Sequence, residues 1–400
     1  MRFLETLNVR CINELALREK RVFLRTDFNF PTDLQGKVLD MDRLDRCVPT
    51  IRYAIDHNAR LIIASHFGRP AGAKDVEYTL EPFAAKLAEL LDMDIYFFED
   101  CYGMGALQMV KDLKPGQILV LENLRFNEDE KKNSTAFARE LAKMCDVYIN
   151  DAFGVSHRRD ASIVSLPKFV DTRGAGLSFK DEVEQLAGLV SLQRGDGFYA
   201  VIGGTRAEEK IGIIRPLLEI ADKILLGGAI ANLFLAAEGY ALGGQNFDKE
   251  KLLLAENILK SAKARNVEIV LPADCVTAES VNSTETVVCD TDKVREGMRI
   301  LDIGPKSLKL FESELKDCKT LFWSGSMGLY ELERFAQGSA GLARLVAASG
   351  FRKIAGGGDT AFVIKKAGLA ESFDMISTGG SAALEFLKNG GMLPGIEALK

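Results

Sequence analysis

The stretch "GFYAVIGGTRAEEKIG", residues 197–212, contains a pattern that recurs along the chain and decides its fold class. An apolar run typical of a β-strand reaches Gly203 and Gly204, and a segment with helical spacing follows. Similar runs occur at 21–27, 60–65, 94–98, 117–121, 146–151, 197–203, 223–227, 267–272, 320–325, 352–357 and 374–378. Helix-patterned segments separate them, and this alternation is typical of parallel sheets with helices on their faces.

Two architectures fit such an alternation, a single (β/α)8 barrel and two doubly wound α/β halves. The apolar runs outnumber the strands of one barrel. Residues 166–196 contain no convincing strand and have the pattern of a helical connector. We therefore favour two halves joined in this segment, and in either architecture ligands gather beyond the carboxyl ends of the strands.

Composition excludes several classes of function. Lys and Arg number 51 against 57 Asp and Glu, a net charge of −6, so no overall basic field attracts nucleic acid. The seven cysteines form no CxxC pair, and the three histidines form no HExxH motif, so a zinc site is not expected. The N-terminal residues are charged where a signal peptide needs an apolar run, and the longest apolar stretch, 224–237, is too short for a membrane span. We expect a cytoplasmic protein without membrane partners.

Polar and basic residues follow four predicted strands of the first half. Asp27 and Asn29 follow one strand, His66 and Arg69 the next, and Arg125 a third, while His157, Arg158 and Arg159 follow the last; Arg43 lies near the start of a helix. A single arginine is usually solvated or paired with a carboxylate. Four strand-end loops with Arg or His predict one shared crevice, because such loops converge. The planar guanidinium binds phosphate or carboxylate in bidentate fashion, so the predicted ligand is small and multiply anionic.

Three glycine-rich helix starts mark the second half. In the first, Arg206 and Lys210 would share one helix face after Gly203-Gly204. Two interpretations are open: a phosphate-binding helix start, or an ordinary pair of solvated side chains. "AGGGDTAFVI" (355–364) has more glycines than an N-cap needs, and its Asp359 could hold Mg²⁺ beside phosphates. "STGGSAALEF" (377–386) is the third start, and "WSGSMGLYE" (323–331) adds Glu331, a possible sugar-hydroxyl acceptor. No P-loop or dinucleotide fingerprint is present.

Together these motifs resemble the phosphoglycerate kinase family almost from end to end. The likeness rests on "RTDFNFP", "SHFGRP", "LENLRF", "NDAFGVSHR", "IGGTRAEEKIG", "LDIGPKS", "WSGSMGLYE", "GGGDT" and "STGGSAALEFL", in this order. The resemblance implies two Rossmann-like, doubly wound domains facing across a cleft and joined by a helical hinge. Residues 1–172 would bind 3-phosphoglycerate, 173–385 would bind the magnesium nucleotide, and the tail 386–400 would pack back on the first domain.

The resemblance also implies the site residues and the reaction. It assigns seven residues to phosphoglycerate: Asp27, Asn29, Arg43, His66, Arg69, Arg125 and Arg158. It assigns ten to the nucleotide: Gly204, Arg206, Lys210, Gly304, Ser324, Glu331, Gly357, Gly358, Asp359 and Thr360, with Asp359 as the Mg²⁺ ligand and Glu331 on the ribose. Those expected to act on the transferring phosphoryl group are Arg43, Arg206, Lys210, Gly358 and Gly380. The implied reaction is reversible phosphoryl transfer between ATP and the carboxylate of 3-phosphoglycerate, giving 1,3-bisphosphoglycerate and ADP, by a monomer whose domains close.

The departures from the family's pattern cluster in the second half. Arg206 stands where the family has a catalytic lysine, Glu209 replaces an aspartate, and Ser324 and Ser326 replace an asparagine and a proline. Ala229 and Ser381 each stand in for a glycine. Arg keeps the charge of Lys but not its compact shape. Two functions therefore stay open: an active kinase with a retuned nucleotide site, or a catalytically weak relative that binds ligands or partners. An unrelated enzyme such as a dehydrogenase is a third.

Overall fold

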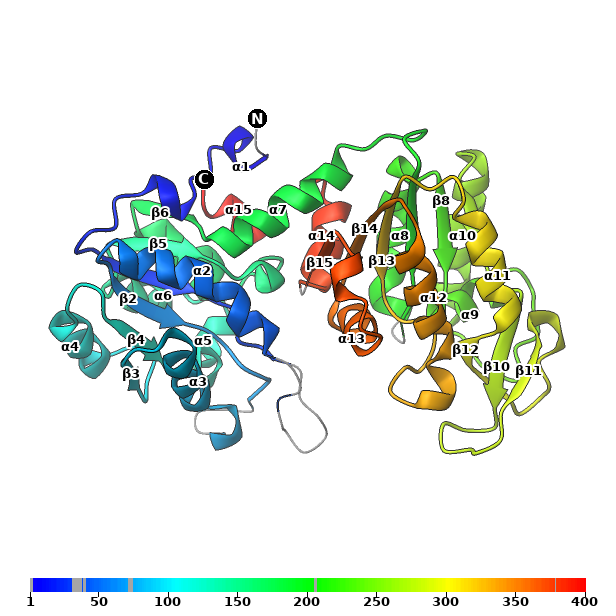
Figure 1. The fold of residues 1–400 in the computed structure, drawn as a ribbon, viewed down its shortest axis with the longest axis horizontal. Helices are drawn as coiled ribbons and strands as arrows, with labels where there is room; N and C mark the ends of the chain where they lie inside the picture. Colours follow the sequence, from blue (N-terminus) through cyan, green and yellow to red (C-terminus); the bar gives the residue numbers. More distant parts are fainter. Residues whose placement is uncertain (1–2, 31–37, 39–40, 71–74, 205–206, 378) are drawn as a thin grey trace. The chain divides into compact units, whose positions relative to one another are not determined.

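The computed structural model describes residues 3–30, 38, 41–70, 75–204, 207–377 and 379–400. They form two compact units, Met1–Ala187 with Gly391–Lys400, and Gly188–Gly390. The first division lies within helix α7 (Leu177–Val190), whereas the sequence placed it at 172/173. Each unit contains one six-stranded parallel sheet, so the predicted α/β class is confirmed (Figure 1).

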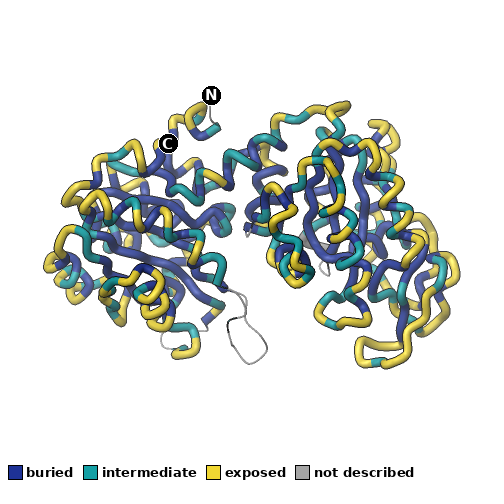
Figure 2. The backbone as a smooth tube through the Cα atoms, in the orientation of Figure 1, coloured by how far each residue is buried: buried dark blue, intermediate teal, exposed yellow. Residues whose placement is uncertain are grey.

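The first unit is built on a sheet whose strands all run parallel. Their order is β3 (Ile95–Phe98), β4 (Ile118–Leu121), β2 (Arg60–Ala64), β1 (Arg21–Arg25), β5 (Val147–Asn150) and β6 (Thr172–Ala175). Its helices are α1 (Phe3–Thr6), α2 (Asp42–Asp56), α3 (Glu81–Leu91), α4 (Met104–Asp112), α5 (Glu128–Lys131), α6 (Thr135–Ala142), part of α7, and α15 (Pro394–Glu397). Every residue of β4 and β5 is buried, as expected for strands covered on both faces (Figure 2).

The second unit has the same architecture with one addition. Its parallel sheet has the order β15 (Met375–Ser377), β14 (Arg352–Gly356), β13 (Thr320–Ser324), β7 (Phe198–Ile202), β8 (Lys223–Leu226) and β9 (Glu268–Val270). Helices α8 (Ala207–Ile220), α9 (Gly228–Ala237), α10 (Lys249–Ala264) and α14 (Ser381–Lys388) pack together, as do α11 (Pro305–Glu314), α12 (Gln337–Ala348) and α13 (Gly358–Lys366). A small antiparallel sheet is added, β11 (Val287–Asp290), β10 (Asp274–Ala278) and β12 (Arg299–Ile303).

One sequence prediction about strands was wrong, and three strands were not predicted. The segment 166–196 does contain a strand, β6, which lies at the sheet edge beside β5. Its sequence "TRGA" has no β-branched apolar run, and its position depends on main-chain pairing, including Ala175 N to Arg10 O at 2.9 Å. The three strands of the antiparallel sheet were not predicted, and one of them, β11, is exposed or half-buried and lacks the apolar alternation of a core strand. Among the described residues, no helix has the length and apolar character to cross a membrane.

A buried carboxyl group, that of Asp302, links strand β12 to the start of helix α12 through hydrogen bonds. Asp302 Oδ1 accepts a hydrogen bond from Ile303 N at 2.9 Å, and Oδ2 accepts one from Gly338 N at 2.7 Å. It forms no salt bridge with any residue that the structure describes. Burial, only partly offset by these two amides, raises the pKa of Asp302 to about 7.

The pKa of Asp302 predicts how stability depends on pH. The folded chain keeps a proton on this carboxyl that the unfolded chain releases near pH ~4, so the free energy of unfolding should fall as pH rises from about 4 to about 7. Asp302→Asn cannot ionise and should flatten this dependence, by up to roughly 4 kcal/mol. Thermal unfolding midpoints between pH 4 and 7 test this. The exposed Asp317→Asn is the control and should keep the wild-type slope. An equal slope in Asp302→Asn and wild type would contradict the prediction.

Candidate functional site

The strand order of the first unit brings its candidate residues to one edge of the sheet. The four central strands, β4, β2, β1 and β5, are neighbours and run in the same direction. The predicted residues lie just beyond their carboxyl ends: Asp27 and Asn29 after β1, His66 and Arg69 after β2, Arg125 after β4, and Arg158 after β5. The convergence expected from the sequence therefore occurs.

A neutral histidine lies at the centre of this group. His66 is fully buried, and its Nδ1 lies 3.2 Å from Arg25 Nη2, so Nδ1 accepts from the guanidinium. Burial first, and then the positive charges of Arg125, Arg25, Arg43 and Arg158, hold the pKa of His66 well below its ordinary value. Its Nε2 has no hydrogen-bond partner among the described residues. Four arginines thus act on one uncharged imidazole.

Arg125 has hydrogen-bonding capacity that the protein leaves unused. Its side chain is buried, and Nη1 donates to Gly68 O at 2.8 Å, while Nη2 lies 3.8 Å from Asp160 Oδ2, too far for a hydrogen bond. Nε and Nη2 are buried without a partner in the described chain, as is Nε of Arg158. Burial and the neighbouring Arg158 lower the pKa of Arg125 to about 10. Buried guanidinium nitrogens without hydrogen-bond partners are costly, so this arrangement suits an anionic ligand.

The other predicted residues of this unit are arranged around these arginines. Asp27 Oδ2 accepts from Arg43 Nη1 at 2.6 Å and so fixes that guanidinium. Asn29 Oδ1 accepts from Gly68 N at 3.0 Å, which anchors the turn that also contacts Arg125. Arg69 is exposed and has no ion pair to a described residue.

Sequence reasoning missed the buried support beneath this group. Arg25, the last residue of β1, is fully buried and donates from Nε to Ser162 Oγ at 2.8 Å. Glu130 lies 3.8 Å from Arg25 and accepts from Ser162 through both main-chain N and Oγ. An arginine at the end of an apolar strand was the available signal, but its partners Glu130 and Ser162 lie more than a hundred residues away in the sequence.

In the second unit, two glycine turns pack directly against each other. Gly203 N donates to Ser324 O at 2.9 Å, and Gly204 N donates to Ser326 O at 2.7 Å. Gly204 has φ +110°, and a Cβ added at Gly203 would lie 2.2 Å from the Ser326 carbonyl oxygen. Only glycine permits this contact, which joins the ends of β7 and β13.

Lys210 extends over the same turns. Its Nζ lies 3.5 Å from Ser324 Oγ and 2.3 Å from the position that a Cβ on Gly325 would take. A positive charge is therefore held beside two glycine turns and a hydroxyl group. Arg206, its predicted companion, lies outside the described residues.

The other two glycine-rich helix starts also meet. Thr360 is buried, accepts from Gly325 N at 2.7 Å and donates to Gly356 O at 3.2 Å, which ties α13 to the turn after β13. Gly357 has φ +108°, and its Cα lies 3.5 Å from where a Cβ on Gly380 would be. Gly358 has open space at its Cβ position.

Three further nucleotide candidates differ in how they are placed. Asp359 is exposed, and its Oδ1 accepts from the Tyr330 hydroxyl at 3.1 Å, while Glu331 is exposed on the adjoining loop. Gly304 packs against another side chain, because a Cβ there would lie 2.3 Å from the Asp274 carboxylate. That packing is by itself a reason for glycine at this position, so the predicted nucleotide contact of Gly304 stays a prediction.

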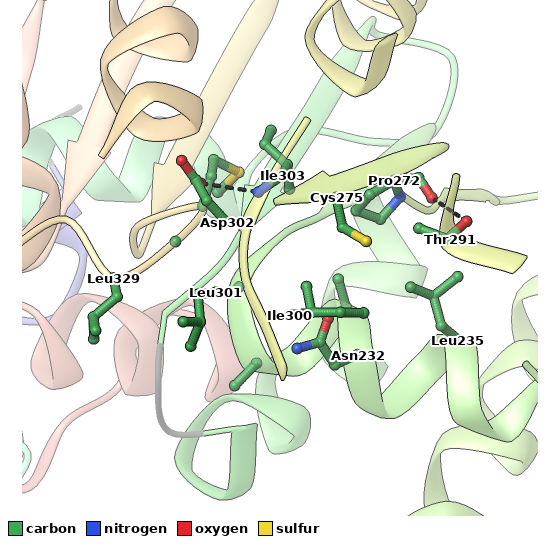
Figure 3. A pocket seen from close by; sticks show the side chains of 15 residues that line it. Asn232, Leu235, Pro272, Cys275, Thr291, Ile300, Leu301, Asp302, Ile303 and Leu329 are labelled. Carbon is green, nitrogen blue, oxygen red and sulfur yellow. Dashed lines mark hydrogen bonds between the residues drawn. The ribbon is translucent and has the colours of Figure 1, made fainter. Parts of the chain in front are cut away.

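A cavity of about 140 Å³ adjoins the glycine turns (Figure 3). Its wall comes from the β8–α9 turn, from α9, from β12 and from the loop after β13, and includes Ala229, Leu235, Ile300, Leu301 and Leu329. Gly228 belongs both to this wall and to the turn contact, since a Cβ there would lie 2.7 Å from main-chain atoms of Gly204. An apolar cavity therefore opens beside the candidate phosphate cradle. A cavity of this size admits an aromatic ring.

Besides Ser324, four departures from the family's pattern lie in the described chain: Ala229, Ser381, Ser326 and Glu209. They lie in different parts of the second unit. Ala229 lines the cavity, and Ser381 is the exposed first residue of α14. Ser326 is fully buried, and its Oγ has no partner within the described residues. Glu209 lies in α8, where its side chain is not described.

The donor set allows one kind of metal site. No group of three or more His, Cys, Asp or Glu side chains gathers within the described ranges. A single exposed carboxylate, Asp359, stands at the start of α13 near the glycine turns. Mg²⁺ is commonly bound by one or two carboxylates together with substrate phosphates and water, and the residues present fit that mode.

Comparisons with known proteins agree with this geometry. The family model described as "Phosphoglycerate kinase" matches residues 12–390. A phosphoglycerate kinase of Anaeromyxobacter dehalogenans (strain 2CP-C) is 45% identical over 394 residues, 98% of this chain and 99% of that protein. One from Koribacter versatilis is 42% identical over 397 residues, 97% of this chain and 98% of that protein.

Solved structures agree as well. Phosphoglycerate kinase from Coxiella burnetii matches with a TM-score of 0.83 at 34% identity, over 98% of each chain. The enzyme from Pyrococcus horikoshii OT3 matches with a TM-score of 0.84 at 31% identity, over 97% of this chain and 98% of that one. The chain therefore belongs to the phosphoglycerate kinase family.

Proposed function

We propose that the chain transfers a phosphoryl group reversibly between ATP and the carboxylate of 3-phosphoglycerate, giving 1,3-bisphosphoglycerate and ADP. The observation that carries the proposal is the buried arginine group around His66, whose unpaired guanidinium nitrogens suit a small, multiply anionic ligand. Membership of a kinase family over nearly the whole chain favours this activity over a non-catalytic binding protein and over an unrelated enzyme.

In this proposal the first unit binds 3-phosphoglycerate. Arg125 and Arg158 pair with its anionic oxygens through their unpaired nitrogens, and exposed Arg69 contributes charge at the rim. His66 stays neutral and offers Nε2 for a hydrogen bond. Asp27 and Asn29 contribute by holding Arg43 and the Gly68 turn in place as well as by contacting the ligand.

The second unit binds the nucleotide. Its phosphates lie against the turns at Gly204 and Gly357, near Lys210, Ser324 and Thr360, and its base enters the adjoining apolar cavity. Glu331 accepts from the ribose hydroxyls. Asp359 holds Mg²⁺, which when bound supplies positive charge that neutralises the phosphates.

The chemistry needs no general base, because the acceptor carboxyl has a pKa near ~3.5 and is ionised at neutral pH. Rate enhancement then comes from positioning and from stabilising charge on the transferring group. The chain supplies the charges of Arg43, Arg206 and Lys210 and the main-chain amides near Gly358 and Gly380. These amides are at helix starts, where N–H groups lack partners within the helix.

Because the two substrates bind to different units in this assignment, transfer requires a movement that brings them together. We propose domain closure about the two places where the chain passes between units, near residues 187 and 390. We also propose that the enzyme works as a monomer in the cytoplasm.

One assay tests the function. Purified protein receives 3-phosphoglycerate and MgATP, and formation of 1,3-bisphosphoglycerate is followed through a coupled dehydrogenase. We expect turnover that saturates with both substrates. Saturable binding of both ligands without turnover would instead establish the catalytically weak relative.

Arg125→Lys tests the phosphoglycerate site. Lysine keeps the charge but cannot reproduce the planar fork, so the KM for 3-phosphoglycerate should rise roughly 10- to 100-fold while the KM for MgATP stays unchanged. The matched control is Arg159→Lys, an exposed arginine of the neighbouring loop, which should leave both constants as they are. Equal rises in both KM values would argue against a specific phosphoglycerate contact.

Arg206→Lys tests the departure in the cradle. If Arg206 does the work that the family assigns to lysine, kcat should stay the same or increase, because a compact ammonium restores the geometry of the family's site. Steady-state kcat with both substrates saturating is the measurement. A fall of several hundred-fold would mean that the site has been rebuilt around arginine.

A further inference from the structure

The cavity beside the glycine turns is lined by one polar side chain, Asn232, that makes no hydrogen bond to the described chain. Its lining includes three polar side chains able to form strong hydrogen bonds, Asp302, Thr291 and Asn232 (Figure 3). Asp302 already accepts two main-chain amides, and Thr291 Oγ1 donates to Pro272 O at 3.2 Å. Both therefore already have hydrogen-bond partners within the protein.

Asn232 differs from these two. Only 8% of its surface is exposed, yet its carboxamide makes no hydrogen bond to any residue of the described chain. It comes from α9, whose neighbouring positions are buried and apolar, and Figure 3 shows its amide beside Ile300. The amide is open to the cavity, so a ligand group or a water molecule that enters the cavity can pair with it.

The position of Asn232 relative to the phosphate cradle narrows the choice of ligand. Asn232 lies one helical turn after Gly228, which touches both the cavity and the Gly204 turn. Phosphates at Gly204 would thus direct the other end of a nucleotide, its base, into this cavity. The cavity holds a planar ring but not a whole nucleotide.

We propose that Asn232 recognises the hydrogen-bonding edge of the nucleobase and gives the site a preference for adenine over guanine. The inference rests on the proposed nucleotide site and deepens it. A carboxamide places one donor beside one acceptor, which matches the amino group and the adjacent ring nitrogen of adenine. Guanine presents two acceptors on one edge. If it pairs instead through O6 and N1–H, its 2-amino group faces an apolar wall.

Asp302, the carboxyl group in the cavity wall, is not placed to accept a hydrogen bond from the 2-amino group of guanine. Each oxygen of Asp302 already accepts a main-chain amide, one from Ile303 and one from Gly338, so both oxygens are directed toward their own backbone rather than toward a 2-amino group. Guanine would therefore bury an unpaired donor that adenine does not have, and it should bind more weakly.

Calorimetric titration of Asn232→Leu tests the proposal. Leucine is close in size and removes only the amide. Wild type should bind MgADP at least ~10-fold more tightly than MgGDP, and Asn232→Leu should weaken MgADP binding about 5- to 100-fold while MgGDP changes less than about 3-fold. Magnesium tripolyphosphate, which has no base, should bind both proteins equally.

Two comparisons keep the result interpretable. Thr291→Val changes the same cavity at a hydroxyl that the protein already satisfies, so the ratio of ADP to GDP affinity should stay at the wild-type value. Far-ultraviolet circular dichroism and thermal midpoints show that each variant is folded. If Asn232→Leu leaves the ratio of ADP to GDP affinity at the wild-type value, because neither affinity changes or both fall equally, the role of Asn232 is overturned while the base site is not. If folded wild type binds tripolyphosphate but neither nucleotide, the base site itself is overturned, and if it binds none of the three, so is the nucleotide half of the proposed function.

Discussion

Parallel pairing within each six-stranded sheet is the constraint on which both candidate sites depend. Because all strands of a sheet run in one direction, the loops after their carboxyl ends emerge at the same edge. In the first unit this gathers residues that are distant in sequence, from Asp27 to Arg158. In the second unit the same constraint brings together the turns after β7, β8, β13, β14 and β15. Each sheet supplies the scaffold and leaves the chemistry to its loops.

The two units use that edge in physically different ways. The first collects side-chain charge: four arginines surround a buried imidazole, and burial together with their own fields keeps that imidazole neutral. Glu130 and Asp160 compensate part of this charge, and the rest is left for a ligand. The second relies mainly on backbone, because glycines let the turns at 203–204 and 324–326 approach within hydrogen-bonding distance. Lys210 then adds one localised positive charge.

Two departures from the family's pattern, Ser324 and Ser326, take part in this backbone frame through their main-chain atoms. Ser324 keeps its main-chain contact with Gly203 and places a hydroxyl near Lys210. Ser326 accepts from Gly204 through its carbonyl oxygen, while nothing in the described structure compensates its buried hydroxyl. The frame is made by main-chain atoms, so substitutions of side chains alter the surface offered to a ligand more than the turn itself.

Local patterns in the sequence were sufficient for much of the molecule. Apolar runs of five to seven residues predicted the strands of both parallel sheets except β6, and glycine turns followed by helical spacing predicted where the candidate sites begin. Such patterns are contained in short windows, because strand periodicity and turn conformation are local properties. The strand β6 and the antiparallel sheet were missed because their stability comes from main-chain pairing with other segments.

Only the tertiary structure decided which polar groups are satisfied. In sequence, Arg25 is an arginine at the end of a strand and Asn232 is an asparagine in an apolar helix, and neither position reveals a partner. Folding gives Arg25 three partners, His66, Glu130 and Ser162. It places Asn232 in the wall of a mainly apolar cavity, without a partner in the described chain. Burial and hydrogen-bond satisfaction depend on which distant segments meet, and short-range periodicity contains no information about that.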